Sequence, residues 1–490
     1  MSPKLVVSSQ FDFSQVDFSK ESDVNLDVVL TAPEEDGGEK RIPLYLILTV
    51  DCSGSMDGAK MNSVKSTILK LLEHVTENDV VGIVGFSDNA WDIVPPLPMN
   101  STNRDAAKKA VQAMHVVNGT NIEAALYHAL EKAAAASGDQ VSRIILLSDG
   151  NATTGAKTAA DLITITAKMA KEISMSTFGY GNDYNPEVLA SMATAGRGNH
   201  FYIQNDTDCR SAFALELGGL LSLYGQDIKV TLSMSGTMAV DEFLSGYEAT
   251  QTAGYRGITG GKLTYTIPDI FFGEKKHALL RVKVPQASEA VCARKTKICD
   301  VSVDYLDVAS KSRVTVEGTV KIQYVKPGKV ASEPNKEVKD QLFVLEAAKK
   351  QASAKQMMDQ GNLTGARTIL QEAQVWASGS GTANASLVAS NFSSLLANTE
   401  SAHAYRSVGS KMFASYSTSY VTARGASSDT LDMSYLSKRQ KNVMSSFASP
   451  VTGDSVTSST LVVSAANSIL NTTGIGTALP ADPDKEEDKA

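Results

Sequence analysis

The sequence is poor in cysteine and contains no long apolar run and no long run of basic residues. Its four cysteines include no Cys-x-x-Cys pair, so no zinc cluster is expected. No window approaches the roughly 18 apolar residues of a membrane-spanning helix. Lysine and arginine do not cluster and the net charge is −8, so the electrostatic footprint of a nucleic-acid-binding protein is missing.

Catalytic signatures are missing as well. None of the six histidines lies in a catalytic motif, and the Gly-x-Ser-x-Gly elbow of hydrolases is absent. The phosphate-binding pattern Gly-x-x-x-x-Gly-Lys-Ser/Thr is also absent, which argues against nucleotide hydrolysis. These absences favour a binding protein over an enzyme. Cys292 and Cys299 could pair in an oxidising compartment, but free thiols are the simpler expectation.

One polar turn, residues 51–56, organises the chain. It follows the apolar run 44–50, which is short, partly β-branched and typical of a buried parallel strand. Apolar residues at three- and four-residue steps predict a helix directly after the turn. The polar side chains Asp51, Ser53 and Ser55 are therefore expected at the carboxyl end of a strand, where open α/β sheets bind ligands. One carboxylate and two hydroxyls are hard donors that suit Mg²⁺ or Mn²⁺ better than Zn²⁺.

Two later stretches complete the pattern. The loop 118–121 precedes a predicted helix, and the apolar strand 141–147 ends in Ser148-Asp149-Gly150. In these three places the sequence resembles the von Willebrand factor A domain family, whose metal-ion-dependent adhesion site uses Asp-x-Ser-x-Ser, a distant Thr and a distant Asp. The resemblance implies a site for Mg²⁺ or Mn²⁺ with five ligand residues, namely Asp51, Ser53, Ser55, Thr120 and Asp149. The alternative is a domain that keeps the turn but binds no metal.

The resemblance also implies what such a site binds. A cation held in this way keeps a position that an Asp or Glu of a partner protein can fill, and adhesion sites of this family recognise acidic side chains for that reason. We expect exposed loop residues to form the rim around the metal, namely Met56, Asp57, Asn118, Asn151 and the loop 180–184.

The periodicity of the chain predicts its fold class. Strands alternate with helices over residues 42–223, which predicts a Rossmann-like α/β domain with a mostly parallel sheet flanked by helices. Within it, residues 90–94 are expected to form a short antiparallel edge strand closed by Pro95-Pro96. From about residue 227 to 324 the period changes to two, as in an antiparallel β-sandwich.

A short N-terminal segment has the same period of two. Residues 24–30 alternate apolar and polar side chains, as a half-buried strand does. The segment 268–275 resembles the strand and turn that follow A domains in many soluble family members. In such proteins a strand before the A domain pairs with the later sheet, so the resemblance implies that residues 24–30 join the sandwich and that the A domain is inserted into it.

We therefore expect five segments along the chain. They are an N-terminal arm and strand over 1–41, the A domain over 42–223, the sandwich over 224–326, an α-helical region over 336–448, and a low-complexity acidic tail over 449–490. Within the helical region, a helix pair with its turn at 359–362 is expected, and residues 386–418 are expected to be helical as well.

Three functions remain open. The first is a cytoplasmic binding protein that docks acidic motifs of a partner through the metal. The second is an accessory of ubiquitin transfer, because the domain order resembles a plant group that carries a RING finger before the A domain, although the RING cysteines are missing here. The third is an extracellular adhesion or matrix protein.

Two observations favour the first of these functions. Residues 1–10 lack the apolar core of a secretory signal. Glycans on the sequons at Asn118 and Asn151 would crowd the metal site. Both observations favour a cytoplasmic location.

Overall fold

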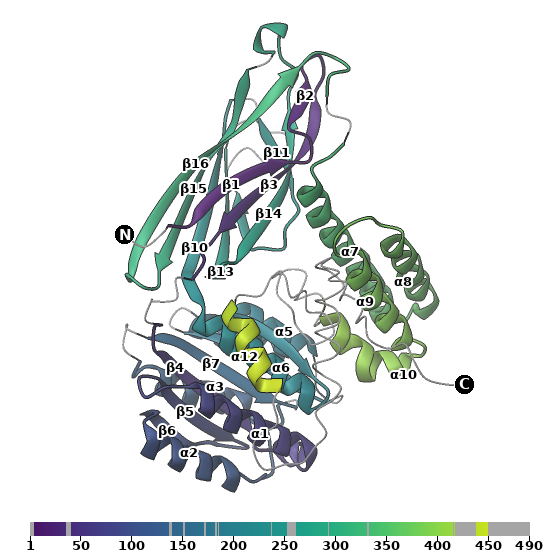
Figure 1. The fold of residues 1–490 in the computed structure, drawn as a ribbon. Coiled ribbons are helices and arrows are strands. Elements are labelled where there is room, and N and C mark those ends of the chain that lie inside the picture. Colours follow the sequence, from purple (N-terminus) through teal and green to yellow (C-terminus); the bar gives the residue numbers. More distant parts are fainter. Residues whose placement is uncertain are drawn as a thin grey trace, which may run out of the picture.

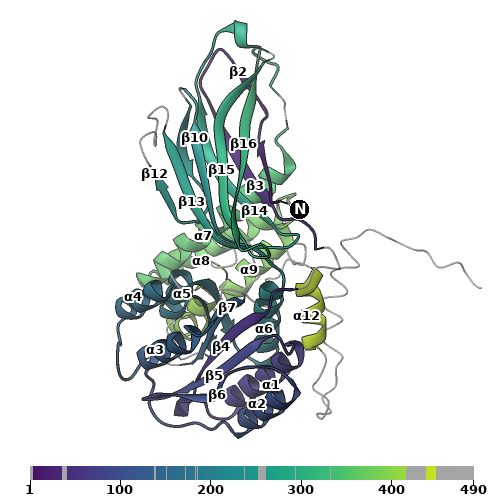
Figure 2. The ribbon, with the colours of Figure 1, turned by 90° about the vertical axis from the view of Figure 1, so that its left-hand side faces the viewer.

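The computed structural model of the chain describes residues 4–35, 41–136, 140–149, 152–170, 173–181, 184, 186–236, 238–251, 261–292, 294–330, 333–414, 416 and 438–448. Three parts are visible in Figure 1: a β-sandwich at one end, an α/β domain at the other, and helices that flank the α/β domain. The view in Figure 2, turned by 90°, shows the same division. The tail expected from residue 449 onward lies outside the described residues.

A six-stranded sheet is the core of the α/β domain, and its strand order is β6-β5-β4-β7-β8-β9. Its strands are β4 (Leu44–Asp51), β5 (Val80–Phe86), β6 (Ala90–Pro98), β7 (Val141–Ser148), β8 (Ser174–Tyr180) and β9 (Arg197–Ile203). Neighbouring strands run parallel except at β6, which is antiparallel to β5. The predicted mostly parallel sheet is therefore confirmed.

The edge strand β6 is longer than the sequence predicts. It does not close at Pro95-Pro96 but continues through both prolines to Pro98, with register shifts along its pairing with β5. Proline is tolerated here because β6 has a neighbour on one side only, so the missing N–H groups cost no ladder hydrogen bond on the open side.

Helices cover both faces of this sheet. One face carries α1 (Ala59–His74), α2 (Ser101–Ala113) and α6 (Asp206–Leu221), and the other carries α3 (Ile122–Ala133), α4 (Ala159–Met169) and α5 (Pro186–Ala195). The short 3₁₀ turn η1 (Gly54–Met56) connects β4 to α1. The apolar residues whose spacing predicts α1 lie on the face that the helix buries, and among them Val64, Ile68 and Leu71 are fully enclosed.

Two sheets enclose the core of the sandwich. The first has the order β1-β3-β14-β11, with β1 (Val6–Phe11), β3 (Ser22–Thr31), β14 (Lys275–Val284) and β11 (Ala239–Phe243). The second has the order β12-β13-β10-β15-β16-β2, with β12 (Ala249–Gln251), β13 (Lys262–Phe271), β10 (Leu223–Met234), β15 (Lys295–Asp307), β16 (Ser312–Val325) and β2 (Gln15–Asp17). Strand pairs are antiparallel except β2 with β16.

The predicted role of the N-terminal strand is confirmed. β3 pairs with β14 along its whole length, from Ser22 opposite Val284 to Thr31 opposite Lys275. Because β3 precedes the α/β domain and β14 follows it, the α/β domain is an insertion in the sandwich. Strand β3 is interior to its sheet, with β1 on its other side, so it contributes to the sandwich core rather than merely to its edge.

The C-terminal helices pack in two separate places. The helices α7 (Lys336–Asp359), α8 (Leu363–Ser378), α9 (Ala385–Ala397), α10 (Ala402–Ala404) and the π-helical turn η3 (Tyr405–Gly409) join the face of α3, α4 and α5. Helix α12 (Lys438–Ala448) instead packs on α6 and α1 through Val443 and Phe447. It meets α6 where a Cβ on Gly218 would stand only 2.7 Å from the Cα of Gln440.

The helical character expected over 386–418 is confirmed for most of the described residues, but the segment is interrupted: α9 ends at Ala397 and a break separates it from α10. In this break the Thr399 hydroxyl donates to the carbonyl of Leu395 at 2.7 Å. Residues 417–437 lie outside the described part of the chain. None of the described helices has both the length and the apolar character needed to cross a membrane.

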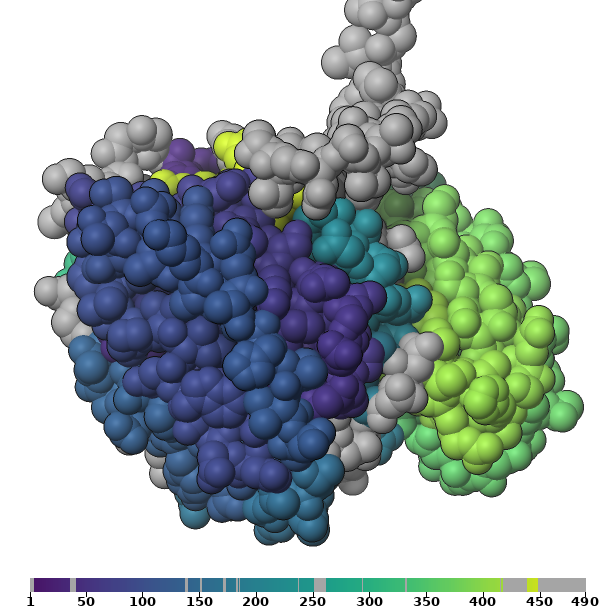
Figure 3. All heavy atoms as spheres, turned by 90° about the horizontal axis from the view of Figure 1, so that it is seen from below, coloured from purple at the N-terminus to yellow at the C-terminus, as the bar shows by residue number. Residues whose placement is uncertain are grey.

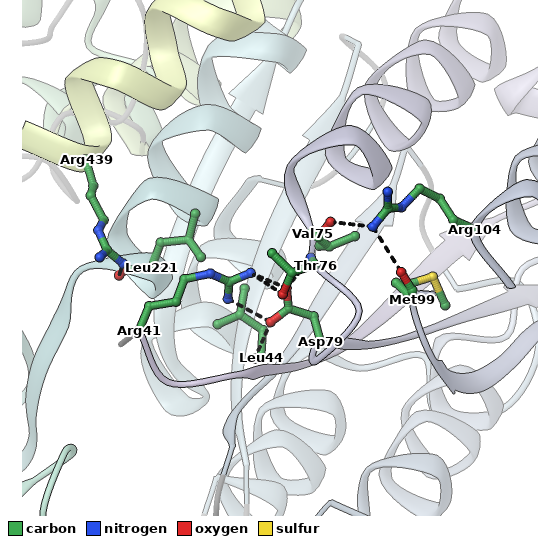
Figure 4. Close-up of polar contacts among 9 residues, drawn as sticks. All are labelled: Arg41, Leu44, Val75, Thr76, Asp79, Met99, Arg104, Leu221 and Arg439. Carbon is green, nitrogen blue, oxygen red and sulfur yellow. Dashed lines mark hydrogen bonds and ion pairs between the residues drawn. The ribbon is translucent and has the colours of Figure 1, made fainter. Parts of the chain in front are cut away.

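Polar contacts hold the amino-terminal edge of the α/β sheet, which is the edge that joins the sandwich. Figure 4 shows Arg41, from the entering linker, directed at Asp79, which also accepts from the backbone of Leu44 and Thr76. Nearby, Arg104 donates to two backbone carbonyl groups of adjoining loops. The polar turn 51–56 lies at the opposite, carboxyl-terminal edge of the same sheet.

Candidate metal centre

The turn after β4 holds Asp51 in a fixed orientation. The side chain is fully buried. Its Oδ1 accepts from the backbone N–H of Ser53 at 2.8 Å, and its Oδ2 accepts from the Ser148 hydroxyl at 2.6 Å. Strands β4 and β7 are parallel neighbours with Val50 opposite Leu147, so the ends of both strands lie side by side. Asp51 and Asp149 are thereby brought to one edge.

Three of the predicted ligands contact one another directly. The hydroxyl groups of Ser53 and Ser55 are 3.0 Å apart, and the Ser55 hydroxyl donates to Oδ1 of Asp149 at 2.8 Å. Asp149 follows β7 and is 1% exposed, whereas Ser55 is exposed. The cluster therefore has a buried acidic floor and an open side at Ser55.

Thr120 reaches the site from a third segment. It is buried, and its backbone carbonyl accepts from the N–H groups of Thr153 and Thr154. The segment before it lies against the turn, because the N–H of Val117 donates to the carbonyl of Cys52 at 2.5 Å. Among the hydrogen bonds of the described residues, none joins the Thr120 side chain to the other four predicted ligands. The backbone contacts place the segment that carries Thr120 against the turn.

Burial sets the protonation chemistry of the turn. It raises the pKa of Asp51 to about 6; the hydrogen bonds from Ser148 and Ser53 oppose this rise, and the neighbouring charge of Asp149 adds to it. Burial also raises the pKa of the Cys52 thiol to about 12, so this thiol stays protonated at neutral pH. A thiol rather than a thiolate is neither a good nucleophile nor a good metal ligand. The chemistry of the turn is therefore that of oxygen donors.

Lys60 is a site residue that the sequence analysis missed. Its amino group forms an ion pair with Oδ2 of Asp149. Lys60 lies in the first turn of α1, where the helix dipole disfavours a positive charge. A basic residue in that place, just after an acidic turn, is the signal that could have indicated a pairing carboxylate.

The predicted rim is correct only in part. Asp57 and Asn118 are exposed as expected, but Met56 is fully buried in the core between the sheet and α1. Tyr180 and Tyr184 are also buried, because Tyr180 contacts the thiol of Cys209 and Tyr184 packs against neighbouring rings. In their place, Val117 is 43% exposed beside the turn. Residues 151 and 182–183 lie outside the described residues.

The donor set fits a hard divalent cation. It offers two buried carboxylates and hydroxyl groups, and the raised pKa of Asp51 indicates negative charge that the surrounding protein does not fully compensate. It has no soft ligand, since the one thiol in the turn stays protonated. Within the described part of the chain, this turn included, no three His, Cys, Asp or Glu side chains come together, so the candidate site depends on hydroxyl groups beside its two carboxylates.

A mostly parallel open sheet covered on both faces, with a polar turn at the carboxyl end of a central strand, defines a doubly wound α/β domain. Domains of this class bind their ligands at the carboxyl ends of the strands. Residues 46–213 match the von Willebrand factor type A domain family. This part of the chain is therefore a von Willebrand factor A (VWA) domain, accompanied by two further sheets and C-terminal helices.

Several known proteins are similar to longer parts of the chain. An uncharacterized protein of Synechocystis sp. is 30% identical over 202 residues, which cover 39% of this chain and 47% of that protein. The E3 ubiquitin-protein ligase WAVH1 of Arabidopsis thaliana is 21% identical over 345 residues, which cover 70% of this chain and 46% of the ligase. The chain thus spans less than half the length of either relative.

The fold also occurs among solved structures. A von Willebrand factor type A protein from Catenulispora acidiphila has a TM-score of 0.59 and 18% identity, and the match covers 80% of this chain and 88% of that one. The shared fold therefore extends well beyond the VWA domain.

Proposed function

We propose that the protein is a metal-dependent protein–protein interaction module that binds acidic side chains of a partner, rather than an enzyme. The observation that carries the proposal is the oxygen cluster of Ser53, Ser55 and Asp149 beside buried Asp51, at the ligand-binding edge of a VWA sheet. VWA domains typically act in protein–protein interaction, which supports the same function.

Each residue has a role that its environment supports. Asp51 and Asp149 supply negative charge from a buried floor, and the hydroxyls of Ser53, Ser55 and Thr120 supply neutral oxygen donors. The donors to Asp51 fix the direction of its carboxylate before any ligand arrives. Bound Mg²⁺ or Mn²⁺ would supply a coordination position for an Asp or Glu of the partner.

Metal binding can be measured directly by calorimetry on the full chain. We expect one Mg²⁺ or Mn²⁺ per chain, bound weakly in the absence of a partner. Asp149→Ala should abolish this binding while the protein stays folded, because the side chain lies at the polar end of a strand and its removal opens no apolar cavity. Asp105→Ala, an exposed carboxylate on α2, is the matched control and should bind as the wild type does. Normal affinity in Asp149→Ala would refute the assignment.

Partner binding needs a second experiment. The full chain should capture a set of proteins that is lost with EDTA and lost again in Asp51→Ala. Loss of a charged contact at a desolvated centre costs roughly 2–5 kcal/mol of binding free energy, enough to prevent capture of a partner that binds with micromolar affinity. Partners that remain bound in EDTA would place the interaction on the sandwich or the helices.

Similarity to a ubiquitin ligase supports a second candidate function. The match to WAVH1 covers 70% of this chain and so includes more than the VWA domain. The protein would then act as an adaptor in ubiquitin transfer. An in vitro conjugation assay with a separate RING ligase tests this: addition of the protein should raise transfer to a captured partner, and Asp51→Ala should remove the effect.

We also propose a cytoplasmic location. The four cysteines are free, and Cys52, Cys209 and Cys299 are buried thiols, which fits a reducing compartment. Fractionation of cells that express the protein tests this location, and recovery in the medium would favour an extracellular adhesion or matrix protein.

A further inference from the structure

The ion pair between Lys60 and Asp149 joins three segments at the site. Lys60 is the second residue of α1, and Asp149 follows β7. The aliphatic stem of Lys60 lies against Gly181, which follows β8: a Cβ on Gly181 would stand 2.9 Å from Cε of Lys60. Gly181 has a positive φ of 73° and no side chain, so the stem can pass over its backbone. The ammonium group is thus held among the oxygen donors of the proposed metal site.

The start of α1 is an unfavourable place for the positive charge of Lys60, and among the described residues only Asp149 forms an ion pair with it there. The first turn of a helix presents unpaired N–H groups and the positive end of the helix dipole. That turn of α1 contains no acidic residue that could compensate Lys60 locally. Asp149 is 1% exposed, so its attraction for the ammonium is weakly screened. The pairing with Asp149 therefore holds Lys60 at the site.

A count of charges shows the consequence. Asp51 and Asp149 carry two negative charges when ionised, and Lys60 reduces the total to one. A divalent cation in the site then leaves one net positive charge, which a single carboxylate from outside neutralises. Without Lys60, the two aspartates alone would neutralise the cation, and a further carboxylate would add an uncompensated negative charge.

We propose that Lys60 determines the ligand preference of the site: it weakens the binding of a divalent cation alone and strengthens the binding of an acidic group to the cation-loaded site. This inference rests on the metal-dependent function proposed above. Lys60 acts through charge and is not itself a metal ligand. With Lys60 present, the empty site carries one net negative charge and the cation-loaded site one net positive charge. Only the site that holds both the cation and an acidic group is neutral, so the two ligands favour each other's binding.

The test uses Mn²⁺ titration by calorimetry on the full chain, with three variants. Lys60→Met removes the charge but keeps a long stem, and we expect it to bind Mn²⁺ at least about tenfold more tightly than the wild type. Lys60→Arg keeps the charge and should stay within about threefold of the wild type. Lys109→Met removes an exposed lysine on α2, remote from the turn in its sequence and contacts, and should change nothing.

A second measurement probes the acidic ligand with acetate. Saturating acetate, compared with chloride at equal ionic strength, should raise the Mn²⁺ affinity of the wild type more than that of Lys60→Met. If Lys60 only supported the local structure, Lys60→Met would bind Mn²⁺ more weakly than the wild type. Acetate would then raise the Mn²⁺ affinity of both proteins by the same factor. If thermal unfolding shows that Lys60→Met is not folded, Lys60→Gln replaces it with the same expectations.

The outcomes separate this inference from the function on which it rests. Absence of Mn²⁺ binding by the wild type would overturn the proposed function itself. Mn²⁺ binding by the wild type, with equal or weaker binding by the neutral Lys60 variant, would overturn the inference alone. Equal acetate effects in the wild type and the neutral variant would refute the claimed preference for acidic ligands.

Discussion

Two buried aspartates stand at opposite ends of the same sheet, and their surroundings differ. Asp79, at the amino-terminal edge, is fully buried but accepts from the guanidinium of Arg41, from the N–H groups of Leu44 and Thr76 and from the Thr76 hydroxyl (Figure 4). Burial alone would raise the pKa of Asp79, but these donors, with Arg41 foremost, outweigh burial and lower it. Its charge is fully used within the protein.

Asp51 is equally buried, but its hydrogen-bond donors are neutral: the Ser53 N–H and the Ser148 hydroxyl. Burial dominates there, and the pKa rises to about 6. Lys60 pairs with Asp149 instead. A buried carboxylate with one charged donor and several neutral donors is compensated within the protein. A pair of carboxylates with one shared cation retains negative charge for a ligand.

The largest effect should come from a truncation that begins at residue 42. It removes β3 from the interior of its sheet, together with Arg41, the charged partner of Asp79. The sandwich would lose the buried face of β3 and expose the edge of β14, so we expect aggregation or loss of cooperative unfolding. A matched truncation that removes only residues 1–3 should behave as the full chain. Equal solubility and heat resistance of the two truncations would show that β3 is dispensable.

The next effect separates the two aspartates. Asp79→Ala leaves the Arg41 guanidinium and two backbone N–H groups without their acceptor, and we expect a loss of about 3–5 kcal/mol in the free energy of unfolding. Asp51→Ala leaves only two neutral donors, the Ser53 N–H and the Ser148 hydroxyl, without their acceptor, and it removes a carboxylate whose ionised form is disfavoured by burial. The expected loss in EDTA is therefore smaller, about 1–2 kcal/mol. Urea unfolding of both variants measures the difference. Equal losses would contradict the contrast between the two sites.

The pH dependence of stability should have opposite signs at the two positions. The lowered pKa of Asp79 contributes stability above its unfolded value of 3.8, and this contribution is lost as the pH falls below it. The raised pKa of Asp51 means that the folded state holds a proton more tightly, so stability falls as the pH rises from about 4 to about 6.

Asparagine variants report each contribution by difference from the wild type. Between pH 4 and pH 7 in EDTA, Asp51→Asn should gain stability relative to the wild type, because it removes the fall. Asp79→Asn should lose most at neutral pH and progressively less under acidic conditions. Differences of the same sign for both variants would show that burial at Asp51 is compensated in the same way as at Asp79.

The sequence predicts the strands and their ends better than it predicts what lies around them. Buried apolar runs such as 44–50 mark the strands, and the polar residues after them mark the carboxyl edge of the sheet. The resemblance to the VWA family then implies that Asp51 and Asp149 belong to one site. Met56 was misplaced because its enclosure depends on packing between the sheet and α1. The surface on which α12 packs cannot be predicted from the sequence either, since only the assembled fold shows that Gly218 leaves room for Gln440.

The smallest effect should come from the rim of the site. Asp57 is exposed next to the turn, and among the contacts of the described residues none ties it to the five predicted ligands. In Asp57→Ala we therefore expect unchanged stability and Mn²⁺ affinity within about threefold, with capture of partners weakened by about 1 kcal/mol or less, as for other exposed charges. Because exposed charges act mainly on association rate, the change should shrink as salt is raised. Complete loss of capture in Asp57→Ala, at normal Mn²⁺ affinity, would move the centre of the interaction from the metal to its rim.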